Sequence, residues 1–176
     1  VGWLTLYAGI AGGADIILLP EVPYDINKVV EAINKRTKAG KGFTILAVAE
    51  GAISKEDSSL TKKAYKAKVA DRKYPSVSYE IADQIYEAAG VEVRVTVPGH
   101  TQRGGSPCPY DRVLCTRLGS AAAKAIMDED YGCMIAMING QTKRVPLADV
   151  AGKLKMVDPN CQMIKEAKRI GISFGD

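Results

Sequence analysis

The pattern of apolar and polar residues divides the first part of the chain into alternating helices and strands. Small and apolar residues dominate positions 3–13, which predicts a buried helix. Continuous apolar runs at 14–19 and 43–49 predict two strands that are buried on both faces. The amphipathic stretch 25–38 between them predicts a helix capped by Asp25. Two strands that bracket a helix form a βαβ unit, so the sequence predicts a parallel sheet and an α/β fold.

The second part of the chain continues with helices, one more strand and a hairpin. Alternation at 92–97 predicts a strand whose polar face carries Glu92, Arg94 and Thr96. Asn139-Gly140 between two strand-like runs predicts a tight β-hairpin. The remaining patterns predict helices at 77–89, 112–127 and 158–169, and hairpin strands at 132–138 and 142–147.

Composition and length place only broad limits on the class of protein. The chain has 176 residues, 47% hydrophobic and 25% charged, which suits a single globular domain over 1–176. No run of about 18 apolar residues or signal peptide is present, so we expect a cytoplasmic protein without a membrane partner. The chain opens at Val1, without a methionine and directly in a predicted helix, which indicates a piece of a longer protein.

The cysteines do not predict a metal site. Four cysteines occur without a CxxC spacing, and the chain has only one histidine. Structural zinc needs clustered thiolate and imidazole ligands, so no metal ligands are assigned. Reduced thiols, as in cytosolic proteins, are the expected state.

Residues 55–73 form a basic segment. They include seven lysines and arginines against three acidic residues, a local charge of +4 that equals the net charge of the whole chain. A basic helix can contact nucleic acid or an acidic partner. No aromatic platform or recognised nucleic-acid motif accompanies it, so the sequence favours a solvated or interface helix and makes nucleic acid an unlikely partner.

A glycine-rich stretch at 97–107 carries the most distinctive chemistry. It contains the only histidine, His100, together with Arg103, and it follows the predicted strand that bears Arg94. Glycines let a ligand approach the main chain closely, and positive side chains around such a turn suit a phosphate monoester. The alternative is that these side chains are ordinary surface or structural residues.

Glu50 stands directly after the second predicted strand. Ligands of open α/β sheets bind outside the carboxyl ends of the strands. A carboxylate in that place can accept hydrogen bonds from sugar hydroxyls, or it can simply cap a helix or face solvent. Position alone leaves both interpretations open.

The string Gly-His-Thr-Gln-Arg-Gly-Gly-Ser-Pro at 99–107, followed by Asp111-Arg112, resembles the sugar-phosphate loop of the 6-phosphofructokinase family. Ala49-Glu50-Gly51-Ala52 resembles the segment that carries the hexose-contacting glutamate of that family. The resemblance covers nearly the whole chain but only the carboxyl-terminal half of the family's length. It implies the fructose 6-phosphate-side lobe of a three-layer α/β/α fold with a mostly parallel sheet. Because the family varies in length near the basic segment, residues 53–76 are predicted to be an insertion.

The resemblance also implies a function, namely phosphoryl transfer from ATP or pyrophosphate to the 1-hydroxyl of fructose 6-phosphate in glycolysis. Arg94, His100 and Arg103 would bind the 6-phosphate and Glu50 the sugar hydroxyls. Arg94 would reach the site of a neighbouring subunit in a homodimer or homotetramer.

The family's donor-phosphate loop and catalytic aspartate belong to the other half of its length. We therefore assign no catalytic residue, and Mg²⁺ would accompany donor phosphates bound mainly outside this chain. The fragment would be inactive alone, and the donor is left open between ATP and pyrophosphate. The alternative function is a non-catalytic sugar-phosphate-binding or regulatory module.

Overall fold

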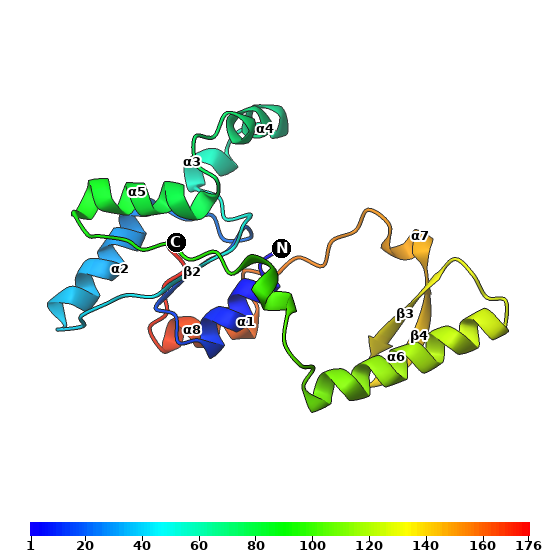
Figure 1. Cartoon of the computed structure of the whole chain (residues 1–176). Helices are drawn as coiled ribbons and strands as arrows, with labels where there is room; N and C mark the ends of the chain where they lie inside the picture. Colours follow the sequence, from blue (N-terminus) through cyan, green and yellow to red (C-terminus); the bar gives the residue numbers. More distant parts are fainter. The chain divides into compact units, whose positions relative to one another are not determined.

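The computed structural model describes residues 1–176, which form two compact units (Figure 1). Unit 1 comprises Val1–Thr96 and Lys155–Asp176, and unit 2 comprises Val97–Leu154. The single domain predicted over 1–176 stays a prediction. Unit 1 contains α1 (Trp3–Ala11), β1 (Ile16–Leu18), α2 (Ile26–Lys38), β2 (Leu46–Val48), α3 (Lys55–Ser58), α4 (Lys62–Ala70), α5 (Val77–Ala89) and α8 (Gln162–Arg169). Unit 2 contains the 3₁₀ helix η1 (Gly99–Arg103), α6 (Pro109–Met127), β3 (Cys133–Ile138), β4 (Gln141–Pro146) and α7 (Leu147–Val150).

A parallel pair of strands lies at the centre of unit 1. β1 and β2 run parallel, with Ile17 opposite Ala47, which confirms the predicted parallel sheet. The carboxyl-terminal tail lies along the other edge of β1, where the Ile17 N–H donates to the Ser173 carbonyl at 2.8 Å. Both edges of β1 are therefore paired, whereas β2 pairs on one edge alone.

Helices cover both faces of this sheet. Ile17 and Leu19 belong to a buried cluster with residues of α1 and α8. Ile16 and Leu18, which alternate with them, belong to a second cluster with residues of α2 and α5. Successive side chains of a strand point to opposite faces, so the two clusters form layers on either side of β1 and β2. This arrangement confirms the α/β class and gives unit 1 its three layers.

The tail 171–176 completes the first of these clusters. Phe174 is fully buried, and the neighbouring Gly175 adopts a left-handed backbone with φ of 72°. A Cβ at Gly175 would come within 3.0 Å of the Tyr24 side chain, so only glycine fits this close approach. Burial also raises the pKa of Tyr24, whose ring is packed in the second cluster.

The structure contains the predicted helices, although several begin at other residues than predicted. Asp25 caps α2, since its carboxylate accepts from the Asn27 N–H at 2.9 Å. The basic segment forms two short helices, α3 and α4, instead of one, and Ser54 and Thr61 cap them. α6 begins at Pro109 and α8 at Gln162, in both cases a few residues away from the predicted start. No helix of the chain is both long and apolar enough to cross a membrane.

The predicted strand at 92–97 is wrong. The structure has no strand pairing there. Burial follows the alternation only in part: Val93 and Val95 are half-buried and Arg94 is exposed, but Val97 is exposed as well. Alternation reports which side chains face the protein, whereas a strand also needs a paired neighbour. β2 pairs only with β1, so residues 92–97 form an extended segment without a ladder.

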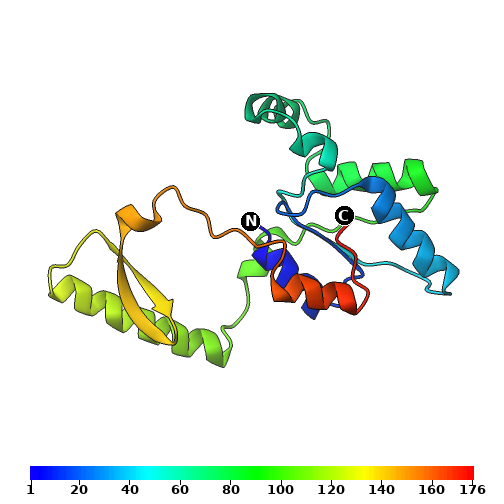
Figure 2. The same ribbon diagram turned by 180° about the vertical axis from the view of Figure 1, so that it is seen from behind.

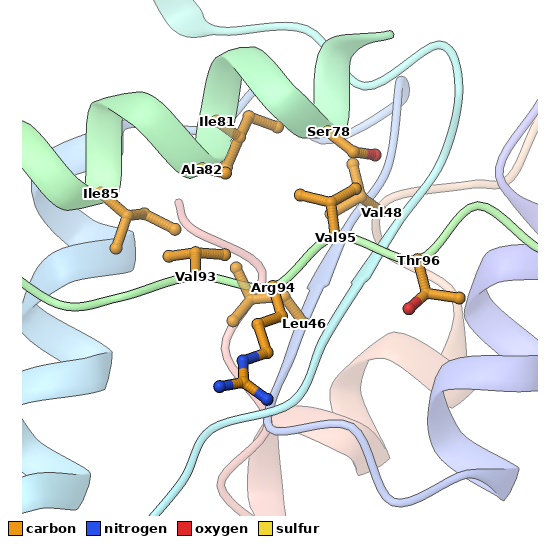
Figure 3. A pocket seen from close by; sticks show the side chains of 10 residues that line it. All are labelled: Leu46, Val48, Ser78, Ile81, Ala82, Ile85, Val93, Arg94, Val95 and Thr96. Atoms are coloured by element: carbon orange, nitrogen blue, oxygen red, sulfur yellow. The ribbon is translucent and has the colours of Figure 1, made fainter.

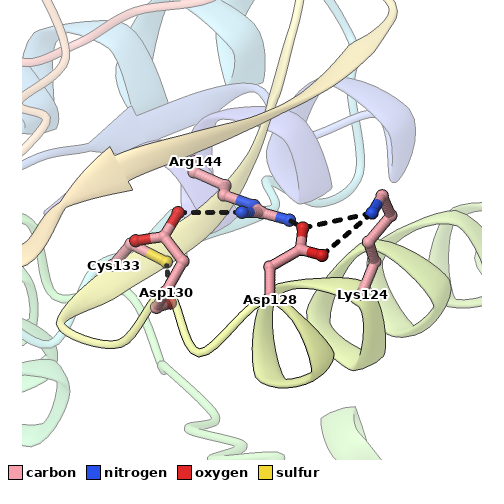
Figure 4. A network of polar contacts seen from close by, with 5 residues as sticks. All are labelled: Lys124, Asp128, Asp130, Cys133 and Arg144. Carbon is pink, nitrogen blue, oxygen red and sulfur yellow. Dashed lines mark hydrogen bonds and ion pairs between the residues drawn. The ribbon is translucent and has the colours of Figure 1, made fainter.

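Unit 2 is a helix and a hairpin joined by charged side chains. The predicted hairpin is confirmed, with Ile138 opposite Gln141 around Asn139-Gly140, and it lies beside α6 in both views (Figures 1 and 2). Arg144 of β4 forms ion pairs with Asp128 at 2.6 Å and with Asp130 at 2.9 Å (Figure 4). Hydrogen bonds from Arg144 and then Lys124 hold the pKa of Asp128 below its ordinary value. These contacts link the end of α6 to β4.

We predict that Phe174→Ala destabilises the protein strongly. Removing a fully buried aromatic ring leaves a cavity, so the free energy of unfolding should fall by about 3–5 kcal/mol. Chemical denaturation measures this change. Ile170→Ala is the control, because Ile170 is 74% exposed and its loss should have little effect. An equally small effect of Phe174→Ala would show that the tail does not contribute to the core.

Candidate functional site

His100 and Arg103 share one face of η1. Residues three apart lie above one another in a 3₁₀ helix, so His100 and Arg103 are on the same side of the turn. Both side chains are exposed, and neither forms a hydrogen bond or ion pair within the chain. Gly99 precedes them with φ of 52°, a left-handed conformation that glycine adopts without strain. The turn therefore presents two free cationic or polar groups together, which suits an anion.

The loop that holds this pair is anchored to α6 through Asp111. The carboxylate of Asp111 accepts from the Cys108 N–H at 3.0 Å, which forms part of a capping box at the start of the helix. Hydrogen bonds from the thiol and the main chain of Cys108 hold the pKa of Asp111 below its ordinary value of 3.8. The sequence analysis placed the start of α6 too late. Two sequence signals mark the observed start: Pro109 at the first helical position and Asp111 two residues later.

Glu50 projects from a turn at the carboxyl end of β2. The Ala49 N–H donates to the Leu18 carbonyl at 3.0 Å, so the ladder continues one residue past β2. The Ala52 N–H then donates to the Ala49 carbonyl at 2.9 Å, which closes a β-turn with Glu50 and Gly51 at its tip. Glu50 is exposed and forms no ion pair, so its carboxylate is free to accept hydrogen bonds from a ligand.

Arg94 lies in the extended segment that follows α5. Val93 and Val95 point toward α5 and line a cavity of about 110 Å³ beside β2, whereas the Arg94 guanidinium points away from α5 (Figure 3). Its Nε lies 3.4 Å from a Glu92 oxygen, and the two side chains are 89% and 79% exposed. An ion pair that long and exposed contributes little, so Arg94 is available to another anion.

The structure brings the predicted residues together in part. His100 and Arg103 lie on one turn of unit 2, and Glu50 and Arg94 both belong to unit 1. The assignment of all four to a single binding site stays a prediction. No group of three or more His, Cys, Asp or Glu side chains in the chain is arranged to hold a metal ion.

Comparison with known proteins gives one consistent result. A family model described as phosphofructokinase matches residues 1–126. The chain is 50% identical over 175 residues to an ATP-dependent 6-phosphofructokinase of Spirochaeta thermophila, a match that covers 99% of this chain and 48% of the relative. It is 42% identical over 159 residues to a pyrophosphate–fructose 6-phosphate 1-phosphotransferase of Amycolatopsis methanolica, covering 90% and 46%. The chain thus spans about half the length of the curated relatives it matches.

A solved structure supports the fold. The pyrophosphate-dependent phosphofructokinase of Nitrosospira multiformis superposes with a TM-score of 0.70 at 20% identity, covering 100% of this chain and 46% of that one. At this level of identity the likeness concerns the fold alone.

We predict that Asp111→Ala lowers the thermal stability of α6 and its loop at neutral pH but not at low pH. The folded pKa of Asp111 is depressed, so its contribution is fully present above the ordinary value of 3.8 and is lost as the pH falls from there through the lower folded pKa. Thermal unfolding of wild type and variant at pH 7 and pH 3 measures the difference. Glu129→Gln, an exposed acid without an ion pair, is the control. A difference of equal size at both pH values would contradict the role given to the Asp111 carboxylate.

Proposed function

Because the chain belongs to the phosphofructokinase family, we propose that it forms the fructose 6-phosphate side of a phosphotransferase. The full enzyme transfers a phosphoryl group from ATP or pyrophosphate to the 1-hydroxyl of fructose 6-phosphate and yields fructose 1,6-bisphosphate. One relative is named for ATP and another for pyrophosphate, and this supports keeping both donors as candidates. We further propose that this enzyme is a cytoplasmic homodimer or homotetramer.

The main support for this proposal is that His100 and Arg103 on η1 have no hydrogen-bond or ion-pair partner within the chain. His100 and Arg103 point from one face of a turn whose backbone is set by glycine, and no acidic side chain of the chain neutralises them. A guanidinium binds phosphate oxygens through charge-assisted hydrogen bonds, and an imidazole beside it adds a further donor. We assign the 6-phosphate of the sugar to this pair.

Glu50 and Arg94 complete the proposed half-site. The carboxylate of Glu50 accepts hydrogen bonds from sugar hydroxyls, since ionised carboxylates act as acceptors only. Arg94 reaches the 6-phosphate bound by a neighbouring subunit, a role supported by its exposure and its weak internal partner. The chain thus binds and orients the sugar. Phosphoryl transfer depends mainly on positioning and charge neutralisation, to which Mg²⁺ on the donor phosphates contributes when bound.

We predict that Arg103→Ala in the full-length enzyme weakens fructose 6-phosphate binding about ten- to a hundredfold. This loss corresponds to a charge-assisted contact of roughly 1.5–3 kcal/mol. Calorimetric titration measures the affinity. Arg169→Ala, which removes an exposed arginine from the last turn of α8, should leave it unchanged. Unchanged affinity in Arg103→Ala would remove η1 from the site.

We predict that Glu50→Gln weakens hexose binding more than donor binding. The substitution preserves size but replaces an ionised carboxylate, which only accepts hydrogen bonds, with a neutral amide whose NH₂ group donates them. Separate titrations with fructose 6-phosphate and with the donor compare the two affinities. Equal losses of both would mean that Glu50 only supports the fold.

We predict that Arg94→Ala and Arg103→Ala complement one another in mixed dimers of the full-length protein. If Arg94 serves the neighbour's site, each mixed dimer has one site with both arginines and one with neither. Fructose 6-phosphate affinity should partly return in the mixture, while each homodimer stays weak. Mixed dimers that form without regaining affinity would place Arg94 outside the neighbour's site.

A further inference from the structure

α4 is a helix that the rest of its chain does not cover. It extends from the body of unit 1 and buries none of its nine residues (Figures 1 and 2). It is held by the Thr61 cap at its start and by an ion pair of 2.6 Å between Lys68 and Asp57. Isolated helices shorter than about 12–15 residues are marginal in water. A further contact would therefore stabilise α4.

One face of α4 is basic and partly apolar. Lys62 and Lys66 lie one turn apart, and Val69, which is 38% exposed, follows on the same side. Neither lysine forms an ion pair within the chain, in contrast to Lys68. This face thus offers two unpaired ammonium groups with the spacing of one helical turn.

α5 presents the opposite charge with the same spacing. Asp83 and Glu87 are exposed and lie one turn apart, and α5 contains no lysine or arginine. Tyr79 and Tyr86 flank them and are 38% and 62% exposed. Asp83 accepts only from the Tyr74 hydroxyl, at 2.7 Å, and Glu87 has no partner in the chain. Like charges four residues apart destabilise a helix, so a cationic neighbour would stabilise α5.

We propose that α4 of one copy of this chain lies against α5 of a second copy, with Lys62 and Lys66 opposite Asp83 and Glu87. One chain carries both complementary faces, so two copies related by a two-fold axis would form the contact twice. The exposed tyrosines of α5 would add contact area, and their rings would offer cation–π contacts to the lysine ammonium groups. A second copy is the favoured occupant because the chain itself supplies the exposed carboxylate pair that the two lysines lack. The contact is independent of the sugar-phosphate site and uses a surface other than Arg94.

Zero-length carbodiimide cross-linking of the full-length protein tests this contact. The reagent joins an ammonium directly to a carboxylate only where the two touch. We expect a covalent dimer on a denaturing gel whose digest links Lys62 or Lys66 to Asp83 or Glu87, with a yield that falls in high salt. Absence of a covalent dimer, or a dimer without this peptide pair, would overturn the proposal.

Charge reversal separates pairing from loss of folding. Lys62→Glu with Lys66→Glu should lower the yield of the dimer about tenfold, and adding Asp83→Lys with Glu87→Lys should restore it with the linked residues exchanged. The control Lys143→Glu with Lys153→Glu makes the same charge change at exposed positions of unit 2 and should leave the yield unchanged. A quadruple variant that regains no dimer would contradict the charge pairing.

Discussion

Burial of β1 on both faces is the constraint on which unit 1 depends, whereas β2, predicted as equally buried, is only half-buried. A parallel sheet needs a helical layer on each side, and β1 and β2 obtain these layers from α1 with α8 and from α2 with α5. The last residues of the chain, with Phe174 among them, close one of the two layers and pair with the free edge of β1. The carboxyl end of β2 lies at the edge of the sheet, and the turn that follows exposes Glu50.

The loop that we propose binds the sugar phosphate follows a different principle. It has no core of its own, and its shape comes from left-handed glycines, a single 3₁₀ turn and the capping box of α6. Such a loop orients side chains without burying them. His100 and Arg103 therefore stay solvated and unpaired, and the proposed function uses that freedom: a phosphate can replace water without displacing an internal ion pair.

Much of the fold was predictable from periodicity, because helices and strands that bury one face repeat their apolar residues regularly. The parallel pair, α2 with its Asp25 cap and the Asn139-Gly140 hairpin are confirmed for this reason. The prediction of a strand at 92–97 failed because an alternating pattern reflects which side chains are buried and does not show that the segment pairs with another strand. The structure of the tail 171–176 was not predicted because its two apolar residues, Ile172 and Phe174, are too few to define a period, and their burial depends on contacts distant in sequence. The candidate site required the family resemblance, since one histidine and a few arginines near glycines have many structural explanations.

The central claim is that this chain supplies the sugar-phosphate half-site. A crystal structure of the full-length protein with fructose 6-phosphate tests it most directly. The account predicts the 6-phosphate within hydrogen-bonding distance of His100 and Arg103 of one subunit and Arg94 of its neighbour, with Glu50 on the sugar hydroxyls. A sugar phosphate bound away from η1 would contradict it.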